Sequence, residues 1–307
     1  MNAAAPRLTQ PPPHEEGSRV FLDYTQDELD AASDQSAYQA NIEQLRKRWI
    51  SNSARTRARL GEPLRRAYGA AEIEGLDIFR TTRQAAPVFV FIHGGAWRAG
   101  KARGYSAPAE TFIRAGAHFV VPDFLWVQDT GGDLLPIADQ IRRAIAWVWR
   151  NAESFGGDPN RLYLGGHSSG AHMAAVALTT DWAREFDVPA DLIKGGLCSS
   201  GMYDLTPVRL SQRSSYVKFT DAMVAALSPI RHLDHLGAPL IVSYGTYETP
   251  EFQRQARDFA AAVKASGKPV ELLVGEDYSH LEVPETLCNP YGLLGAAMLD
   301  LMGLAQG

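Results

Sequence analysis

A serine bracketed by glycines is the first chemically suggestive feature of the chain. Residues Gly166 to Gly170 read Gly-His-Ser-Ser-Gly, between an apolar run, Arg161 to Gly165, and an alanine-rich stretch, Ala171 to Leu178. Glycines two residues before and after Ser168 allow the close backbone approach of a sharp turn from strand to helix. At the start of that helix, free N–H groups and the helix dipole favour developing negative charge. The pattern predicts a nucleophilic Ser168, with a chance match as the alternative.

A second glycine pair follows an apolar run upstream of this serine. Val88 to Ile92 is typical of a buried parallel strand, and it leads into His-Gly-Gly-Ala-Trp at residues 93–97. With no side chain in the way, the backbone N–H groups of Gly94 and Gly95 can face a substrate carbonyl. We predict that they form an oxyanion hole together with the N–H group of Ser169. A plain Gly-Gly turn after a strand is the alternative.

The elements that must position these residues alternate between short apolar runs and longer amphipathic stretches. We expect strands at residues 65–68, 76–80, 88–92, 118–121, 161–165, 193–199, 240–244 and 270–274. We expect helices at residues 107–115, 133–155, 251–266 and 291–304, a helical pattern from 25 to 60, and irregular structure from 202 to 228. This alternation predicts an α/β fold, a mostly parallel sheet with helices on both faces and an active site at the carboxyl ends of its strands.

Four motifs together resemble those of the α/β-hydrolases, in the branch of the hormone-sensitive-lipase-like enzymes and the arylformamidases (kynurenine formamidases). Residues 93–97 resemble the HGGxW motif of this branch, and residues 166–170 resemble its serine turn. Residues 250–255 are similar to a PEFxRQ stretch that follows the triad acid in the formamidases, and residues 200–205 to their SGxYDL. The resemblance covers roughly residues 20 to 305 and implies an α/β-hydrolase fold.

The resemblance also implies a base and an acid, in the chain order serine, acid, histidine. Among the histidines beyond the serine, His280 alone lies in a loop after a late strand, whereas His232 and His235 precede the strand at 240–244. We therefore expect His280 to take the proton of Ser168.

Glu248 is the predicted acid, because it follows the strand at 240–244 in a loop that can turn toward the histidine. The formamidases usually carry Asp at this place, and Glu is one methylene longer but accepted in the fold. The rivals are Glu251, which begins the next helix, and Asp277, which stands close to His280 in the same loop.

Three further histidines have structural explanations that we prefer. His167 and His172 flank the serine, but two histidines without a third ligand are weak evidence for a metal site. We expect His93 to brace the glycine loop through a hydrogen bond. No metal and no cofactor are expected.

The substrate pocket is the least defined part of the prediction. Trp97 and Trp126 fall just past strand ends, so they are candidates for its lining, with core packing as the alternative. Tyr216 and Phe219 are candidates from the stretch 202–228, with packing onto the body as the alternative. The resemblance further implies that residues 20–60 form a helical cap over the site, between a flexible N-terminus (1–19) and an α/β-hydrolase domain (61–307).

Composition narrows the range of partners. The chain has 307 residues, of which 45% are hydrophobic and 21% charged, and its formal net charge is −5. A basic run at 46–48, with Arg55, Arg57 and Arg59, also contains acids nearby, so we interpret it as a solvated helix face rather than a nucleic-acid site. Two cysteines in unrelated contexts indicate no disulfide framework, and no signal or membrane segment is evident. We expect a cytoplasmic protein without a membrane partner.

These observations predict a cofactor-independent serine hydrolase acting on a small-molecule ester or amide. A carboxylesterase and an arylformamidase-like amidase are the two hydrolases that the sequence predicts. A non-catalytic ligand-binding member of the fold and an acyltransferase are the alternatives. Since related enzymes are often dimers, a homodimer is a further expectation.

Overall fold

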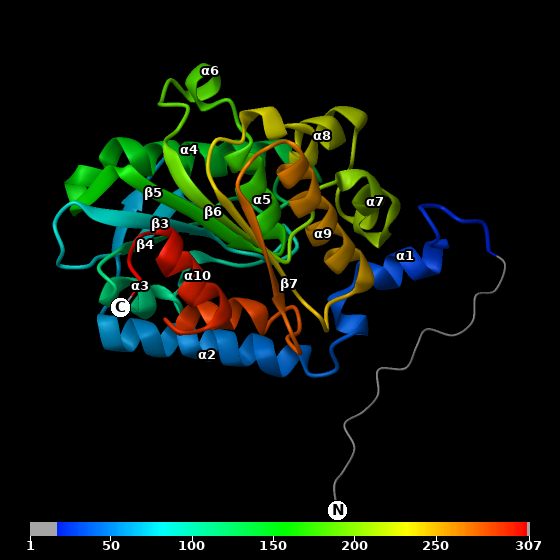
Figure 1. The fold of residues 1–307 in the computed structure, drawn as a ribbon, viewed down its shortest axis with the longest axis horizontal. Coiled ribbons are helices and arrows are strands. Elements are labelled where there is room, and N and C mark those ends of the chain that lie inside the picture. The colour runs from blue at the N-terminus through cyan, green and yellow to red at the C-terminus, as the bar shows by residue number, and fades with distance from the viewer. Residues whose placement is uncertain (1–16, 306–307) are drawn as a thin grey trace, which may run out of the picture.

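An eight-stranded sheet lies at the centre of residues 17–305, the part of the chain that the computed structural model describes (Figure 1). Its strands are β1 (Leu64–Ala67), β2 (Gly75–Phe79), β3 (Ala86–Ile92), β4 (His118–Pro122), β5 (Gly157–His167), β6 (Ile193–Ser199), β7 (Leu240–Gly245) and β8 (Val270–Gly275). They pair in the order β1-β2-β4-β3-β5-β6-β7-β8, antiparallel from β1 to β4 and parallel beyond. Residues 1–16 of the predicted flexible N-terminus lie outside the described residues.

Helices pack against both faces of this sheet. The α-helices are α1 (Gln26–Ala32), α2 (Ile42–Leu60), α3 (Ala109–Arg114), α4 (Leu135–Asn151), α5 (Ser169–Leu178), α6 (Trp182–Phe186), α7 (Leu205–Leu210), α8 (Asp221–Ala226), α9 (Pro250–Ala265) and α10 (Leu293–Leu301). Short 3-10 helices are η1 (Gln35–Ala37), η2 (Ala102–Tyr105), η3 (Ala152–Phe155), η4 (Gln212–Ser215), η5 (Pro229–Arg231), η6 (Leu233–His235) and η7 (Val283–Cys288). Figure 1 shows α2, α3 and α10 gathered on one side of the molecule.

Strand β3 shows why the sheet is covered on both faces. All seven of its residues are buried. Val88, Val90 and Ile92 belong to the apolar cluster that includes residues of α4, α5 and α9. Phe89 and Phe91 belong to a second cluster with residues of α3 and α10. Because successive side chains of a strand point to opposite faces, a strand that is apolar throughout needs helices on both sides.

The predicted strands are all present, with ends shifted by a few residues. The stretch 202–228, expected to be irregular, contains α7, η4 and α8, so that expectation is wrong. Asp204 and Thr220 begin the two helices by accepting hydrogen bonds from the N–H groups of Thr206 (2.9 Å) and Met223 (3.1 Å). Such caps stabilise helices that are too short to show an apolar period.

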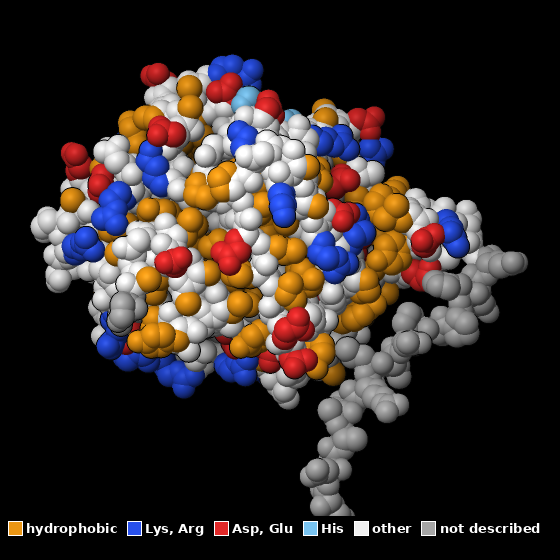
Figure 2. All heavy atoms as spheres, in the orientation of Figure 1, with side chains coloured by type: hydrophobic (Ala, Val, Ile, Leu, Met, Phe, Trp, Pro, Cys, Tyr) orange, Lys and Arg blue, Asp and Glu red, His pale blue; other side chains and the backbone are white. Residues whose placement is uncertain are grey.

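The helical pattern from 25 to 60 is likewise divided, into α1, η1 and α2. Helix α2 runs along the body, and its arginines meet acids there: Arg48 pairs with Glu285, Arg57 with Asp77 (2.7 Å) and Arg59 with Glu110. Figure 2 shows basic side chains along the edge that α2 occupies. The pairs of Arg48 and Arg59 agree with a solvated, ion-paired helix face, whereas Arg57 is buried with Asp77 and does not belong to such a face.

Two further expectations can be compared with the described residues. Cys198 and Cys288 are both free thiols. Between residues 17 and 305, no helix is both long and apolar enough to cross a membrane.

Candidate active site

The turn between β5 and α5 holds Ser168 in a strained conformation. Its φ is 58° and its ψ is −127°, a region that residues with a side chain rarely adopt. A Cβ atom on Gly166 would lie 2.3 Å from the carbonyl oxygen of Gly170, and one on Gly170 would lie 2.1 Å from the carbonyl oxygen of Ile92. Both flanking positions therefore require glycine. The turn lifts the Ser168 hydroxyl above the carboxyl end of the sheet, at the N-cap position of α5.

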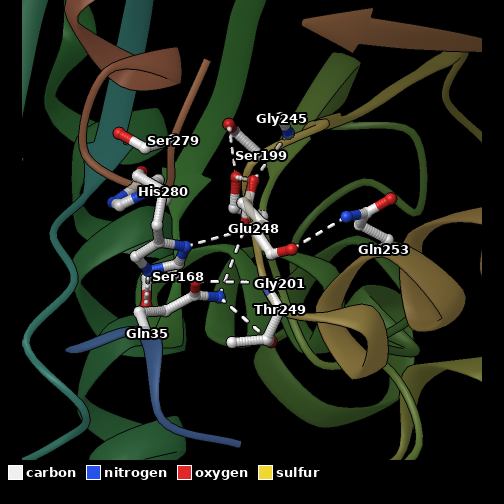
Figure 3. Close-up of polar contacts among 12 residues, drawn as sticks. Gln35, Ser168, Ser199, Gly201, Gly245, Glu248, Thr249, Gln253, Ser279 and His280 are labelled. Atoms are coloured by element: carbon white, nitrogen blue, oxygen red, sulfur yellow. Dashed lines mark hydrogen bonds and ion pairs between the residues drawn. The ribbon is translucent and has the colours of Figure 1, made fainter. Parts of the chain in front are cut away.

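Ser168 is the first member of a hydrogen-bonded chain (Figure 3). The Ser168 Oγ atom lies 2.9 Å from Nε2 of His280, and Nδ1 of His280 lies 2.8 Å from Oε2 of Glu248. Because a carboxylate only accepts, Nδ1 of His280 carries the proton and Nε2 is free to accept from the serine hydroxyl. The three side chains come from the ends of β5, β7 and β8. Serine, histidine and acid are thus aligned as general-base activation of a nucleophile requires.

Glu248 is 2% exposed, yet its carboxylate is fully supplied with donors. Its Oε1 atom accepts hydrogen bonds from the hydroxyl of Ser200 (2.6 Å) and the N–H group of Gly245 (2.7 Å). Its Oε2 atom accepts from His280 and, at 3.4 Å, from the side-chain amide of Gln35. A buried carboxylate needs such partners in order to remain charged.

The two rival acids point elsewhere. Glu251 pairs with Arg254 at 2.6 Å on α9, and Asp277 is exposed at the tip of the loop after β8. Backbone contacts join that loop to the one carrying Glu248: the N–H group of Asp277 donates to Oγ1 of Thr246 (2.8 Å), and Tyr247 donates to the carbonyl of Tyr278 (3.0 Å). These contacts fix the distance between the acid and the histidine, although the two residues are far apart in the chain.

The motifs at 200–205 and 250–255 meet behind Glu248. Oε1 of Gln255 accepts from the N–H groups of Tyr203 (2.6 Å) and Asp204 (2.9 Å). The Tyr203 hydroxyl donates to the carbonyl of Cys198 (3.0 Å), and the Tyr203 ring is 1% exposed. Both motifs therefore support the loop of the acid, and neither reaches the cavity above Ser168.

The loop after β3 brings Gly94 and Gly95 beside the serine. A Cβ atom on Gly94 would lie 3.2 Å from Cβ of Ser168, and Gly95 has a φ of 122°. Among residues 17–305, the N–H groups of Gly94 and Gly95 have no hydrogen-bond partner. The N–H group of Ser169 belongs to the first turn of α5, which lacks acceptors within the helix. The loop is held from below, because Trp97 donates its N–H to the side chain of Ser169 (3.2 Å).

The three histidines near the serine turn and the glycine loop are buried and bonded within the protein. His93 contacts the carbonyl of Gly94 through Nδ1 (2.9 Å) and stacks on Phe124, as expected for a brace of the glycine loop. His167 contacts the carbonyl of His280 through Nε2 (2.7 Å), and burial, with the nearby His280, holds its pKa well below its usual range. His172 bridges the indole N–H of Trp97 (3.2 Å) and the carbonyl of Leu227 (2.7 Å). Burial lowers the pKa of His172 to about 4. In the described chain, no three potential ligands cluster as a metal site would require.

Residues 20–60, called the N-terminal segment below, also reach the site. Besides its contact with Glu248, Gln35 accepts from the N–H group of Thr249 (3.3 Å) and donates to the hydroxyl of Thr249 (3.4 Å). Gln39 donates to the hydroxyl of Ser279, next to His280. Sequence reasoning missed both glutamines. In the sequence they are ordinary polar residues, and only their burial in the folded protein marks them as functional candidates.

A cavity of about 910 Å³ opens above Ser168 and His280. Its wall comes from the N-terminal segment, the loop after β3 and the stretch around η4; the lining residues are Ser33, Asp34, Gln35, Ser36, Ile42, Arg46, Trp49, Ile50, Ala54, Arg57, Gly95, Ala96, Arg98, Ala99, Gly100, Lys101, Arg103, Gly104, Tyr105, His167, Ser168, Gln212, Arg213, Ser215, Tyr216, His280, Leu281 and Pro284. Most of the cavity wall therefore lies outside the parallel sheet.

Only one of the four predicted pocket residues lines the cavity. Tyr216 lies on the cavity wall, and Trp97, Trp126 and Phe219 do not. Trp97 is 2% exposed and bonds to His172, and Trp126 donates its indole N–H to the carbonyl of Gly100 (2.9 Å) behind the wall. Phe219 packs against the core. Buried packing of Trp97 and core packing of Phe219 keep these rings out of the cavity.

Solved structures establish the fold. The sheet matches that of a Silicibacter protein with a TM-score of 0.76 at 24% identity, covering 88% of this chain and 98% of that one. It also matches an esterase of Pyrobaculum calidifontis with a TM-score of 0.68 at 18% identity, covering 91% of this chain and 98% of that one. The chain has the α/β-hydrolase fold. The predicted fold class, including its mostly parallel sheet, is confirmed.

Sequence comparisons agree with this assignment. A family model described as BD-FAE matches residues 76–197 of the chain. A kynurenine formamidase of Danio rerio is 29% identical over 243 residues, which cover 77% of this chain and 80% of the relative. Esterase LipC of Mycobacterium tuberculosis is 27% identical over 227 residues, covering 64% of this chain and 54% of the relative. The resemblance to hormone-sensitive-lipase-like and arylformamidase-like proteins is thereby confirmed, and the relatives support hydrolase activity.

Proposed function

We propose that this protein is a serine hydrolase that cleaves a small carboxylic ester or an aryl amide, such as a formamide, through an acyl-enzyme. The observation that carries the proposal is the chain of hydrogen bonds from Ser168 through His280 to Glu248, with 2.9 and 2.8 Å between the joined atoms. It opens onto a cavity large enough for a small organic substrate. Relatives named as a formamidase and as esterases support both bond types.

In the proposed reaction, Nε2 of His280 accepts the proton of Ser168 as Oγ attacks the carbonyl carbon. Glu248 holds the histidine in the required tautomer and stabilises the imidazolium that forms. The N–H groups of Gly94, Gly95 and Ser169 receive the developing negative charge on the carbonyl oxygen. His280 then returns its proton to the leaving alcohol or amine, and water, activated in the same way, releases the acyl group from Ser168.

The formamidase-like motifs do not choose between ester and amide. Gln255 and Tyr203 support the loop of Glu248 and do not line the cavity. They would serve either bond type equally, since both reactions need the same acid and base. The choice between substrates therefore has to be made by measurement.

The first test compares kcat/KM for p-nitrophenyl acetate and for N-formylkynurenine, in the wild type and in Ser168→Ala. We expect turnover of at least one substrate, with kcat lower by several powers of ten in Ser168→Ala. Undiminished turnover in this variant would overturn the role of Ser168. A preference for the ester would identify a carboxylesterase, and a preference for the formamide an amidase.

Labelling with a fluorophosphonate separates a selective enzyme from a binding protein. We expect Ser168 of the wild type to be labelled, because the histidine activates its hydroxyl whatever substrate the cavity selects. Ser168→Ala should not be labelled. A wild type that resists labelling and turns over neither substrate would favour the alternative of a non-catalytic ligand-binding protein. Product analysis with an added alcohol distinguishes acyl transfer from hydrolysis.

A further inference from the structure

The cavity above Ser168 is basic, although the chain as a whole is acidic. Its lining contains six basic side chains, those of Arg46, Arg57, Arg98, Lys101, Arg103 and Arg213. Asp34 is the one acid in the lining that the structure describes, and it is occupied in capping η1 through the N–H and hydroxyl groups of Ser36 (2.9 and 2.7 Å). The formal net charge of the whole chain is −5, so this excess of positive charge is local.

Half of these basic side chains are neutralised by acids outside the cavity. Arg46 pairs with Glu43, Arg57 with Asp77, and Arg103 with Glu62. The other three, Arg98, Lys101 and Arg213, have no acidic partner anywhere in residues 17–305. Positive charge held in a concave, partly desolvated site attracts anions.

Arg213 is an unpaired cation that aromatic contacts connect to the reacting groups. Its guanidinium carbon lies 5.7 Å from the ring centre of Trp97, on the loop after β3, and 5.9 Å from that of Phe252. The Phe252 ring in turn contacts the ring of His280, with 5.1 Å between their centres. A single aromatic ring thus separates the guanidinium of Arg213 from the histidine that contacts Ser168.

The guanidinium is held in place while part of it is left without a partner. One terminal nitrogen donates to the hydroxyl of Tyr216 (2.8 Å) and the other to the carbonyl of Ser33 (2.9 Å), at the end of α1. Nε is buried and has no hydrogen-bond partner. No acid neutralises an arginine that is fixed by neutral groups, and the N–H groups that are not used in these bonds can meet a carboxylate, which the planar guanidinium matches.

From this arrangement we infer that the cavity contains an anion subsite centred on Arg213, and that the hydrolase acts on an ester or amide bearing a carboxylate about one aromatic ring away from the scissile carbonyl. Arg98 stacks over Tyr216, with 4.4 Å from its guanidinium carbon to the ring centre, and Lys101 lies at the cavity wall. Both add to the field that draws the anion in. The inference rests on the proposed function, and it goes beyond it because neither bond type requires a charged substrate.

The test compares two acetate esters that differ mainly in charge, 4-acetoxybenzoate and 4-acetoxybenzamide. We expect wild type to prefer the carboxylate by kcat/KM, and Arg213→Met to lower the ratio of the two kcat/KM values about ten- to a hundred-fold. Arg213→Lys keeps the charge without the fork and should fall between them. Arg209→Met is the matched control, because this exposed arginine pairs with Asp221 outside the cavity and should leave the ratio unchanged. A ratio that is the same in all four proteins would overturn the inference.

A binding measurement keeps the subsite testable whatever the catalytic outcome. Calorimetry with Ser168→Ala should show 4-acetamidobenzoate binding more tightly than 4-acetamidobenzamide, and Arg213→Met in the same background should remove the difference. Carboxylate binding that depends on Arg213, without turnover of any ester or amide, would support the subsite and contradict the proposed function. Turnover with no carboxylate preference and no Arg213-dependent binding would support the proposed function and contradict the subsite.

Discussion

The carboxyl edge of the sheet and the N-terminal segment meet at one cavity, but they make different kinds of contact there. The sheet edge places Ser168, His280 and Glu248 on strand ends, joined by hydrogen bonds of 2.8 and 2.9 Å. The N-terminal segment contributes Gln35 from outside, through contacts of 3.3 to 3.4 Å. Rigid strand ends suit reacting groups, which tolerate little displacement. An added segment can reshape the cavity wall without moving them, so we expect changes at the sheet edge to have the larger effects.

The largest effect should follow the loss of charge at the acid. Glu248→Gln keeps the shape of the side chain but offers His280 an amide instead of a carboxylate. The imidazolium would lose its stabilisation and the histidine its correct tautomer, so we expect kcat to fall about 10³- to 10⁴-fold. Steady-state kinetics on the preferred substrate measures this fall. Glu251→Gln, at the rival acid, is the matched control, and a comparable loss of kcat there would contradict the assignment of the acid.

The next effect concerns the glycine loop. Gly94→Ala would place a Cβ atom 2.8 Å from the carbonyl oxygen of His167 and 3.2 Å from Cβ of Ser168. The loop would have to shift, and with it the N–H groups that we assign to the oxyanion hole. We expect kcat to fall about 10²- to 10³-fold.

A matched control for this variant is Gly237→Ala, outside the cavity wall, whose Cβ atom would meet nothing within 4 Å. Fluorophosphonate labelling separates the two steps of the argument, since a displaced loop should slow reaction of Ser168 without removing its hydroxyl. A Gly94→Ala enzyme with wild-type kcat would show that the oxyanion is held elsewhere.

The sheet edge was predictable because its constraints are local. Gly166 and Gly170 are required by backbone atoms within a few residues of the serine turn and by β3 beneath it, so the requirement is visible as a short motif. The apolar run of β3 likewise revealed a strand covered on both faces. Glu248 and His280 followed from chain order in the fold that the motifs resemble. Their actual separation, however, depends on backbone bonds between two loops about thirty residues apart, which no local pattern records.

The cavity wall was not predictable because its residues are brought together by contacts between distant parts of the chain. Trp97 and Trp126 stand next to strand ends in sequence, yet their indole N–H groups find partners in the interior or behind the wall. Gln35 and Arg213 acquire their importance from tertiary contacts alone: Gln35 reaches a loop more than two hundred residues later, and Arg213 lies between rings of two distant elements. No spacing rule connects such positions.

A third prediction concerns stability and again separates the two regions. His172 is buried in α5, with its pKa lowered from 6.5 to about 4 by burial, whereas residues 20–60 contain no histidine. Between pH 6.5 and 4, His172 binds a proton in the unfolded chain but not in the folded chain. The free energy of unfolding should therefore fall as the pH is lowered through this range. The contribution of His172 is on the order of 3 kcal/mol.

Chemical denaturation at several pH values measures this slope. His172→Gln, which keeps a donor for the carbonyl of Leu227, should flatten it between pH 4 and 6.5. His235→Gln at an exposed histidine should leave it unchanged. An unaltered slope in His172→Gln would show that this histidine does not resist protonation in the folded state. Buried His167 and His93, whose pKa values are also lowered by burial, would then be the next candidates.

The smallest effect should come from the N-terminal segment. Gln35→Ala removes contacts to Glu248 and Thr249 that are longer than those within the sheet edge, so we expect kcat to fall only about two- to tenfold. The exposed Gln44, on α2, supplies the control Gln44→Ala. If Gln35 positions the acid, the loss should fall on kcat rather than on KM. If it only shapes the cavity wall, KM should change instead.

Gln35→Glu distinguishes positioning from packing more sharply. It would set a second carboxylate beside Glu248, where like charges repel and where the added negative charge favours the imidazolium form of His280. The acidic limb of the pH dependence of kcat/KM should therefore move to higher pH, an effect that neither Gln35→Ala nor Gln44→Ala should produce. A limb that stays in place would mean that Gln35 is too loosely held to influence the acid. The N-terminal segment would then affect only the binding of the substrate, and the positions of the reacting groups would depend on the sheet edge alone.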